Sequence, residues 1–307
     1  MSGYKKVKDI GEFGLIAKLA RAIKTDNSVV KGIGDDAAVI KFSAHKYWLF
    51  KTDMIVEGVH FKNNMPAQLI GRKALARNIS DIAAMGGIPT HAVISLALPT
   101  KTRVSFIEKI YQGLIRVAKE FKINIVGGDT SRSDKIIISI ALLGQVRKSD
   151  LVLRSGAKKG DLIFTTGRLG NSFKSGKHLF FIPRIQQALS LVRKYKPTAM
   201  IDISDGLIMD LGHILKASCL GAFIYEELIP LNKNANLHSA LYQGEDYELL
   251  FTLPGGKAAR LIRDSRKSNK KFNFYCIGEM VDKKYGLNLI DRRYCFNKIK
   301  PKGFTHF

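Results

Sequence analysis

The stretch Gly32-Ile33-Gly34-Asp35-Asp36 places two glycines directly before two adjacent carboxylates in a chain that is otherwise strongly basic. Glycine lets a backbone turn closely around a ligand. Because acids are scarce here, their positions are informative. Further aspartates flanked by Gly, Ser or Thr stand at the edges of apolar runs: Asp53, Asp81, Asp129, Asp202 and Asp205. Hard cations are commonly ligated by carboxylates in such settings.

Length and composition indicate a folded protein with room for two domains. The chain has 307 residues, 46% of them hydrophobic, which is enough for two ordinary cores. Lys and Arg number 50 against 26 Asp and Glu, so the formal net charge is +24. Such a charge attracts nucleic acid, anionic membranes or phosphorylated small molecules. The charge alone does not choose among these partners.

Membrane and disulfide features are absent from the sequence pattern. No apolar run approaches the roughly 18 to 20 residues that span a bilayer, and the beginning of the chain has no cleavable apolar segment. We therefore expect a cytoplasmic location and no membrane partner. The cysteines Cys219, Cys276 and Cys295 are odd in number and widely spaced. They indicate neither a disulfide framework nor a zinc knuckle, and we expect reduced, mostly buried thiols.

The first half of the chain alternates predicted helices and strands. Periodicity predicts helices over residues 11–24, 66–85 and 104–121. Strands are predicted over residues 37–42, 47–52, 90–98, 123–126 and 135–146, with a further extended piece at 55–61. In this scheme Asp53 ends a strand, and Asp129 follows the short buried strand at 123–126. Asp81 lies near the C-terminal end of its helix, where the helix dipole disfavours negative charge, so a partner cation is expected.

A polar, basic, glycine-bearing segment at residues 147–160 is where we place a domain boundary, which divides the chain into domains 1–147 and 148–307. Beyond it, strands are predicted at 161–166, 199–203, 222–226 and 249–253, and helices at 185–195 and 207–217. A basic helix and two closing strands follow. Strands alternating with helices predict an α/β or α+β fold with two α/β domains.

A single Asp after a strand is most often a helix cap or a turn former, and Asp205 in particular could cap the helix that follows it. Six acids in such settings are harder to explain as unrelated caps: Asp36, Asp53, Asp81, Asp129, Asp202 and Asp205. If they converge, their mutual repulsion requires divalent metal. Oxygen-only clusters suit Mg²⁺, which binds together with substrate phosphates.

The remaining motifs point away from covalent catalysis. The glycine pairs fit neither a Walker A loop nor a G-x-G-x-x-G motif, so tight turns and phosphate-cradling loops are equally good interpretations. Arg154 and Lys158 could neutralise phosphate charge or simply be solvated. His60 is either a structural histidine or a hydrogen-bonding group beside Asp53. Since no nucleophile with a base partner is present, direct phosphoryl transfer is the simplest hypothesis.

These motifs, in their order along nearly the whole chain, resemble the thiamine-monophosphate kinase family. The resemblance lies in residues 32–37 (GIGDDA), 52–53 (TD) with 57–61 (EGVHF), 78–86 (NISDIAAMG), 127–130 (GGDT), 154–161 (RSGAKKGD), 201–207 (IDISDGL) and 244–248 (GEDYE). The wider superfamily includes aminoimidazole ribonucleotide synthetase and selenophosphate synthetase, which also use ATP. The resemblance implies two α/β domains, with N-terminal sheets pairing in a homodimer.

The resemblance also implies a reaction and its residues. The γ-phosphoryl group of ATP would pass directly to thiamine monophosphate, giving thiamine diphosphate, with several Mg²⁺ ions. The implied magnesium ligands are Asp36, Thr52, Asp53, Asp81, Asp129, Asp202 and Asp205. The implied ATP contacts are Gly128, Asp129, Arg154 and Ser204, and the implied substrate contacts are His60, Glu245 and the position of Pro301.

Three departures from the family pattern bear on the site. The family usually has an aromatic residue at the position of Pro301, and Phe304 is a candidate replacement. Lys51 stands where a small residue usually precedes Thr-Asp, so its charge would disturb the metal cluster if it pointed inward. The segment at residues 171–184 is shorter and more basic than usual, which leaves the entry helix of the second domain uncertain.

Three alternatives stand beside the kinase. Another ATP-dependent member of the superfamily is one, although selenophosphate synthetase would need a reactive Cys or equivalent that is missing here. A nucleic-acid-binding protein is the second, suggested by the net charge, but the basic residues are dispersed and no recognition motif is present. The third is an inactive structural protein that keeps the fold, which the intact acids oppose.

Overall fold

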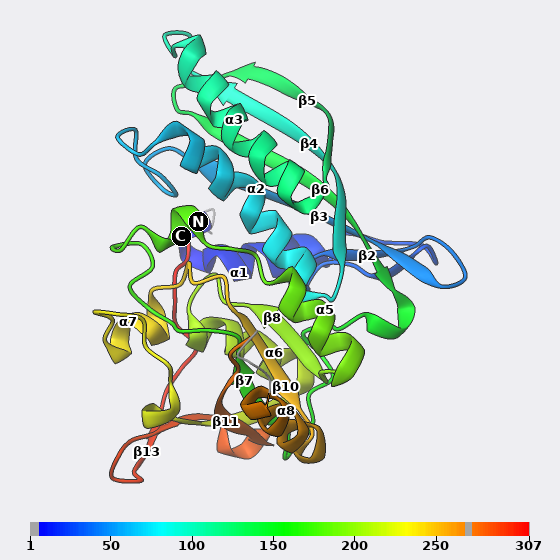
Figure 1. Cartoon of the computed structure of the whole chain (residues 1–307), viewed down its shortest axis with the longest axis vertical. Helices are drawn as coiled ribbons and strands as arrows, with labels where there is room; N and C mark the ends of the chain where they lie inside the picture. The colour runs from blue at the N-terminus through cyan, green and yellow to red at the C-terminus, as the bar shows by residue number, and fades with distance from the viewer. Residues whose placement is uncertain (1–5, 268–271, 307) are drawn as a thin grey trace, which may run out of the picture.

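A computed structural model describes residues 6–267 and 272–306 and shows two mixed sheets packed against each other through helices (Figure 1). The N-terminal sheet has the strand order β1-β2-β3-β6-β4-β5. Its strands are β1 (Val29–Lys31), β2 (Ala38–Lys41), β3 (Lys46–Val56), β4 (Ile88–Leu98), β5 (Asn124–Arg132) and β6 (Ile137–Arg147). All neighbours are antiparallel except β4 and β5. The predicted α/β class is confirmed.

Two helices, α2 (Ala67–Ala84) and α3 (Val104–Phe121), cover the inner face of this sheet and lie close together. Glycines at the crossing make the close approach possible. A Cβ atom on Gly71 would lie 2.0 Å from the backbone oxygen of Ile110, and one on Gly113 would lie 1.9 Å from that of Gln68. A side chain at either position would push the helices apart. Glycine at these two positions therefore allows α2 and α3 to pack closely on the sheet.

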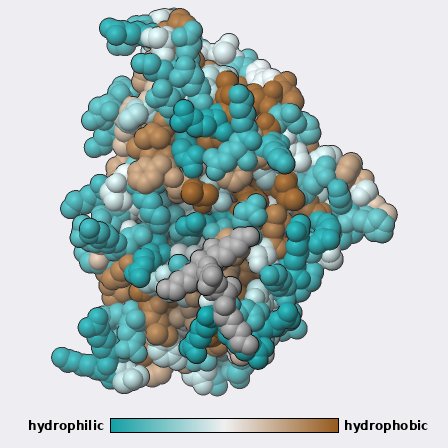
Figure 2. All heavy atoms as spheres, in the orientation of Figure 1, coloured by the Kyte–Doolittle hydropathy of each residue, from teal (hydrophilic) through white to brown (hydrophobic). Residues whose placement is uncertain are grey.

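The outer face of the N-terminal sheet is uncovered and largely apolar. Strand side chains alternate between faces, and on this face Phe50 is 49% exposed, Met54 51% and Val93 40%. Figure 2 shows apolar residues gathered over the strands of this half. A large exposed apolar patch commonly marks an interaction surface.

The C-terminal sheet has the order β13-β12-β9-β11-β7-β10-β8. Its strands are β7 (Leu162–Thr165), β8 (Ala199–Asp202), β9 (Leu220–Tyr225), β10 (Leu249–Leu253), β11 (Tyr275–Asp282), β12 (Leu287–Ile290) and β13 (Phe296–Lys298). The helices of this half are α4 (Lys177–Phe180), α5 (Ile185–Lys194), α6 (Leu207–Ser218), α7 (Leu237–Tyr242) and α8 (Gly255–Lys267). The described part of the chain also contains three single-turn 3₁₀ helices: Lys148–Asp150, Glu226–Leu228 and Lys283–Tyr285.

The two halves share one continuous core. Along β10, Leu249 and Phe251 join the core that contains α2 and α5, whereas Leu250 between them packs with α6 on the other face. The C-terminal sheet is therefore covered on both faces. The core joins α2 to the ends of β8 and β10, so side chains from both halves of the chain meet beside α2.

Several predicted elements are confirmed and others are corrected. The predicted helix 104–121 and strand 249–253 coincide with α3 and β10. The strand predicted to end at Thr52 runs on to Val56, so Asp53 lies within β3 and residues 57–61 form a turn. The short strand 123–126 was predicted to stop before the glycines, but β5 continues through Gly127 and Gly128 and is mostly exposed. Sheet pairing with β4 overrides the local turn propensity.

Other differences concern the ends of the chain and the cysteines. The first helix, α1 (Val7–Ala20), begins earlier than predicted and is interrupted at Gly11, whose φ is 65°. Three strands rather than two follow α8. The cysteines are not mostly buried, since Cys219 and Cys295 are exposed and Cys276 is half-buried; all three are free.

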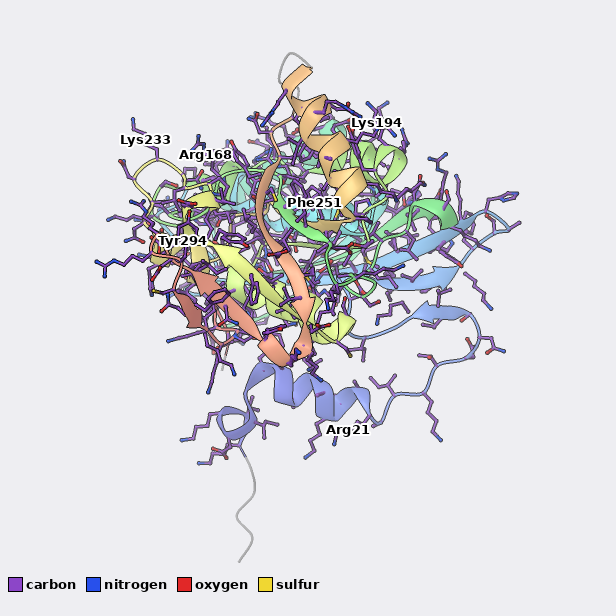
Figure 3. All side chains as sticks on the ribbon, turned by 90° about the horizontal axis from the view of Figure 1, so that it is seen from below. Arg21, Arg168, Lys194, Lys233, Phe251 and Tyr294 are labelled. Atoms are coloured by element: carbon purple, nitrogen blue, oxygen red, sulfur yellow. The ribbon has the colours of Figure 1, made fainter. Side chains whose placement is uncertain are left out.

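Basic side chains project from separate parts of the surface. Figure 3 shows Arg21, Arg168, Lys194 and Lys233 at different margins of the molecule, with Phe251 inside. Charge spread in this way is typical of general solubility and steering rather than of a nucleic-acid groove. Among the described residues, none of the helices has the length and apolar character needed to cross a membrane.

Candidate active site

Three carboxylates converge where the two halves of the chain meet. Asp36 comes from the loop before β2, Asp81 from the last turns of α2, and Asp202 from the end of β8. One oxygen of each lies within 4.8 Å of the others, and all three residues are buried. The structure thus brings together three of the predicted magnesium ligands from segments that are far apart in sequence.

This cluster fits a hard divalent cation. Burial, followed by the nearby charge of Asp36, raises the pKa of Asp202 to about 7, and burial raises the pKa of Asp81 well above its ordinary value. Ser80 Oγ donates a hydrogen bond to Asp202 Oδ2 over 2.6 Å, but Asp36 Oδ2 is buried without a partner. A buried, oxygen-only donor set with an unsatisfied carboxylate oxygen is what Mg²⁺ coordination requires.

Cations of the chain surround the same acids. Arg154 donates to Asp36 Oδ1 from Nη2 over 2.5 Å and from Nε over 3.1 Å. Lys51 Nζ lies 3.1 Å from Asp81 Oδ2. The cation expected beside Asp81 at the C-terminal end of α2 is therefore supplied by β3. Arg77 Nη2 lies 3.1 Å from Asp53 Oδ2, while its buried Nε and Nη1 have no partner. These two buried nitrogens are left as unsatisfied donors.

The loop after β8 is held by Asp210 rather than by a helix cap. Asp210 Oδ2 accepts hydrogen bonds from the backbone N–H groups of residues 204, 205 and 206 over 3.0, 3.0 and 3.1 Å. Gly206 is the N-cap of α6 and no side chain caps it, so Asp205 does not serve as the cap. Burial, and then Glu12, raise the pKa of Asp205 to about 6. Asp205 is therefore left available as a ligand.

His213 extends this part of the site. One atom of His213 lies within 4.8 Å of carboxylate oxygens of Asp205 and Asp210. Burial, followed by Arg154, lowers the pKa of His213 to about 4, so its imidazole is neutral at neutral pH. Phe13 of α1 packs edge-on against this ring, with centroids 5.0 Å apart. The first helix is thereby attached beside the site.

A buried lysine organises the predicted substrate contacts. Lys73 Nζ donates to Glu245 Oε1 over 2.7 Å and to the backbone oxygen of His60 over 2.8 Å, and it lies 2.8 Å from His178 Nδ1. His178 Nδ1 is also 2.9 Å from Glu245 Oε2. Burial lowers the pKa of Lys73 to about 8. Although burial opposes ionisation of Glu245, the hydrogen bond from His178 and the charge of Lys73 lower its pKa to about 2. Glu245 is ionised and held in place.

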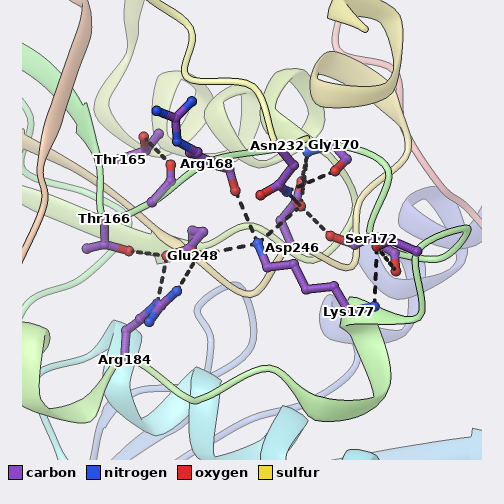
Figure 4. Close-up of polar contacts among 12 residues, drawn as sticks. Thr165, Thr166, Arg168, Gly170, Ser172, Lys177, Arg184, Asn232, Asp246 and Glu248 are labelled. Atoms are coloured by element: carbon purple, nitrogen blue, oxygen red, sulfur yellow. Dashed lines mark hydrogen bonds and ion pairs between the residues drawn. The ribbon is translucent and has the colours of Figure 1, made fainter. Parts of the chain in front are cut away.

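The acids that follow Glu245 are structural. Asp246 accepts from the Gly170 N–H over 2.9 Å and from Ser172 Oγ, and Glu248 is paired with Arg184 and accepts from Thr166 Oγ1 over 2.8 Å. Lys177 Nζ lies 3.5 Å from Glu248 and 3.8 Å from Asp246, between the two carboxylates (Figure 4). The segment at residues 171–184, whose structure the sequence left uncertain, thus supplies the partners that hold residues 246–248 in place.

The C-terminal segment lies across the site. The Phe304 N–H donates to the backbone oxygen of Asp205 over 2.9 Å, and the His306 ring lies 5.2 Å from that of His60. Pro301 packs instead against α6, where a Cβ on Gly212 would meet its ring at 2.7 Å. Of the two candidates for the missing aromatic contact, Phe304 is the one tied to the Asp205 loop.

Three predicted residues lie away from the cluster within one chain. Thr52 is exposed on the outer face of β3, opposite to Asp53. Gly128 and Asp129 are on β5, three strands from β3, and a strand spacing of about 4.8 Å puts Asp129 roughly 14 Å from Asp53. Asp129 is also exposed. Ser204 lies two residues after Asp202, and its N–H donates to Asp210 Oδ2.

The sequence interpretation missed Lys73, Arg77 and His178. A signal for the first two was present, because Lys73, Arg77 and Asp81 are spaced four residues apart and so share one face of α2. Charged residues on the buried face of a helix are rare unless they are paired. His178 had no such signal, since it lies in a short helix whose position is set by tertiary contacts.

The chain matches the models of a family in both halves. Residues 34–146 match the N-terminal domain of AIR synthase related protein, and residues 158–289 match its C-terminal domain. Structures of the hydrogenase maturation protein HypE share this fold, with 19% identity and a TM-score of 0.74 in its complex with HypF. The fold class is that of the AIR synthase related proteins.

More specific relatives are thiamine-monophosphate kinases. That of Buchnera aphidicola subsp. Schizaphis graminum is 36% identical, covering 97% of this chain and 99% of its own length, and that of Escherichia coli strain K12 is 33% identical, covering 97% and 98%. The solved structure of AaThiL complexed with AMPPCP and TMP has a TM-score of 0.85 at 33% identity, with full coverage of both chains. The chain belongs to the thiamine-monophosphate kinase family.

Proposed function

We propose that the chain transfers the γ-phosphoryl group of ATP to thiamine monophosphate, giving thiamine diphosphate and ADP, the final step of thiamine diphosphate biosynthesis. A phosphate oxygen of thiamine monophosphate attacks the γ-phosphorus, and the bond to the β,γ-bridging oxygen of ATP breaks. The observation that carries this proposal is the convergence of Asp36, Asp81 and Asp202 from both halves of the chain. The complex of AaThiL with AMPPCP and TMP, in a chain of the same fold, supports the choice of substrates.

We assign magnesium to the carboxylate cluster. Asp36, Asp81 and Asp202 are the central ligands, with Asp53 and Asp205 at the margins. When bound, Mg²⁺ supplies neutralisation of the triphosphate charge and orients its oxygens for in-line displacement. The chain's own groups bind the rest of the nucleotide: Arg154 and the Ser204 loop lie beside Asp36 and Asp202. Lys158 is not needed in this assignment.

The acceptor site is assigned to Glu245, His60 and the segment that contains Phe304. Burial, then Arg77 and Lys73, lower the pKa of His60 to about 4. A neutral imidazole can lie against the cationic ring of thiamine without charge repulsion. Although burial opposes it, the hydrogen bond from His178 and the charge of Lys73 lower the pKa of Glu245 and keep it ionised, so it can accept hydrogen bonds from the acceptor. Arg77, paired through Nη2 with Asp53, keeps a positive charge near this site, while its Nε and Nη1 are buried.

We further propose a homodimer in which the outer faces of the N-terminal sheets pair. The exposed Phe50, Met54 and Val93 on that face support the pairing. Asp129 and Gly128 lie on edge strand β5 and belong to the same exposed surface, so they would act at the partner's cluster rather than at their own. The expected domain boundary at residues 147–148 and the cytoplasmic location stay predictions.

The test combines reaction and metal site. Purified protein is incubated with ATP, Mg²⁺ and thiamine monophosphate, and thiamine diphosphate is measured by chromatography. We expect product from the wild type and none from Asp129→Asn. Absence of product from the wild type while ATP still binds would contradict the proposed acceptor and favour another ATP-dependent reaction.

A mixing experiment tests the dimer. Asp36→Asn and Asp129→Asn are each expected to be inactive, and we mix them under conditions that exchange subunits. If Asp129 acts on its partner's cluster, each mixed dimer has one intact site, so activity returns to about one quarter of the wild-type value, because half of random dimers are mixed. No recovery, with mixed dimers present by mass, would place Asp129 in its own chain's site.

A further inference from the structure

Three acids assigned to magnesium already have a cation of this chain beside them. Lys51 is paired with Asp81, Arg77 with Asp53 and Arg154 with Asp36. These three acids and Asp202 carry four negative charges against the three cations, so this set has a formal charge of −1 when all seven groups are ionised. Divalent ions therefore meet a much weaker negative charge than the carboxylates alone would give.

The register of the sheet directs Lys51 at the cluster. Side chains of β3 alternate between faces, and the buried Leu49 shares the inner face with Lys51 and Asp53. Lys51 pairs across the sheet with the buried Leu142 of β6. The inner face packs on α2, which carries Asp81. Turning the side chain to another rotamer cannot move it to the outer face, so its ammonium stays near the acids.

The ammonium of Lys51 is largely removed from water and depends on these acids. Its side chain is 24% exposed. Its ion pair with Asp81 Oδ2 over 3.1 Å places a positive charge within the cluster. A divalent ion that used Asp81 Oδ2 would have to displace this ammonium or bind against its repulsion.

We propose that Lys51 is a built-in cation that takes the place of one divalent ion, so that the wild type binds one ion fewer than a variant without this charge. The inference rests on the proposed magnesium site and deepens it. The remaining ions are held by the oxygens that Lys51 does not occupy, among them the unpartnered Asp36 Oδ2. Lys51 would also keep the metal-free cluster folded by offsetting its charge.

The test counts bound Mn²⁺, a paramagnetic substitute for Mg²⁺, by electron paramagnetic resonance in the presence of AMPPCP. The variants are Lys51→Thr and Lys51→Met, which remove the charge with a short and a long side chain. Lys51→Arg keeps the charge, and Lys41→Thr removes an exposed charge from the neighbouring strand β2. We expect one additional Mn²⁺ per chain in the first two variants, and binding at the shared sites about tenfold tighter. The two controls are expected to match the wild type.

A second readout needs no nucleotide. In EDTA, the Lys51→Thr and Lys51→Met variants are expected to unfold at a lower temperature than the wild type, and Mn²⁺ should stabilise them more than it stabilises the wild type. Variants that fold only with Mn²⁺ would support the same conclusion, and variants that fold under none of these conditions would overturn it.

Equal, non-zero Mn²⁺ counts and affinities in the wild type and both charge-removing variants would overturn the role of Lys51 while leaving the metal site in place. Absence of Mn²⁺ binding from all of them would overturn the metal site itself. These outcomes are separate from thiamine diphosphate formation, so failure of the inference and failure of the proposed reaction can be told apart.

Discussion

Two groups of buried acids differ in whether hydrogen-bond donors surround their carboxylate oxygens. Asp246 and Glu248 have a donor for every carboxylate oxygen, from Arg184, Thr166, Ser172 and the Gly170 N–H. Asp36, Asp81 and Asp202 instead face one another, and Asp36 Oδ2 has no donor. Burial raises the pKa of Asp246 to about 6 as well, so a raised pKa does not separate the groups. The two groups are separated by whether each carboxylate oxygen has a hydrogen-bond donor.

The largest effect is expected from replacing one of the acids to which we assign magnesium. Asp36→Asn keeps the size of the side chain but removes a ligand, so kcat is expected to fall about 10³-fold, since metal stabilisation of transition-state charge is worth several kcal/mol. The Asn side chain keeps an oxygen for Arg154, so the loss of unfolding free energy in EDTA is expected to be small beside the loss of activity. A kcat near the wild-type value at saturating Mg²⁺, measured by ADP release, would contradict this assignment.

The satisfied acids should show the opposite behaviour. Arg184→Met leaves the buried carboxylate of Glu248 without its main cation, and breaking a buried pair in this way costs about 3 kcal/mol of unfolding free energy. Urea denaturation followed by circular dichroism measures it. The matched control is Arg260→Ala, which breaks the exposed pair with Asp264 and should cost at most about 0.5 kcal/mol. Equal losses in the two variants would mean that Glu248 is held mainly by its other donors.

Glu245 combines features of both groups, because its carboxylate is paired like Glu248 but is assigned to a substrate. Lys73 holds this carboxylate in place. Lys73→Met removes the donor that fixes the carboxylate, so KM for thiamine monophosphate is expected to rise about tenfold, because a small misplacement weakens binding. KM for ATP should not change, since Lys73 contacts none of the residues assigned to the nucleotide. Lys73→Arg should recover part of the loss. A parallel rise in both KM values would indicate general damage to the site instead.

A smaller effect concerns pH in metal-free protein. The pKa of Asp202 is raised to about 7 and that of Asp35 to about 6 in the folded state, in each case mainly by burial. A group whose pKa is raised on folding stabilises the folded state below its unfolded pKa, and this contribution is lost as pH rises through the folded value. In EDTA, Tm should therefore fall between about pH 4 and pH 7. Asp202→Asn should flatten the slope, and a rising Tm over this range would contradict the shift.

The smallest expected effect is that of overall charge. Because basic residues are spread over the surface, the net charge of +24 should steer two phosphorylated substrates toward the protein. We expect kcat/KM to fall severalfold as ionic strength increases, since salt screens this attraction. A flat profile would leave the charge as a compositional bias.

Much of the site was predictable because its residues lie in local motifs. Asp36, Asp81 and Asp202 follow from strand and helix ends bordered by glycine, serine or threonine, and the structure brings them together. Ser204 was implied only by the resemblance to the family. Predictions failed where pairing between strands overrides local sequence. Gly127 and Gly128 resemble a turn, but the parallel pairing of β5 with β4 keeps them in a strand.

By itself, the sequence determined the two-domain α/β class, most helices and strands, and the acids of the carboxylate cluster, because hydrophobic periodicity and short motifs act locally. Only the tertiary structure decided the partners of those acids. Lys73 and His178 are 105 residues apart, and they meet at Glu245 because α4 packs against α2. Likewise, the register of β3 turned Lys51 inward and Thr52 outward. Side-chain direction and long-range contact depend on strand pairing and packing, which no single stretch of sequence contains.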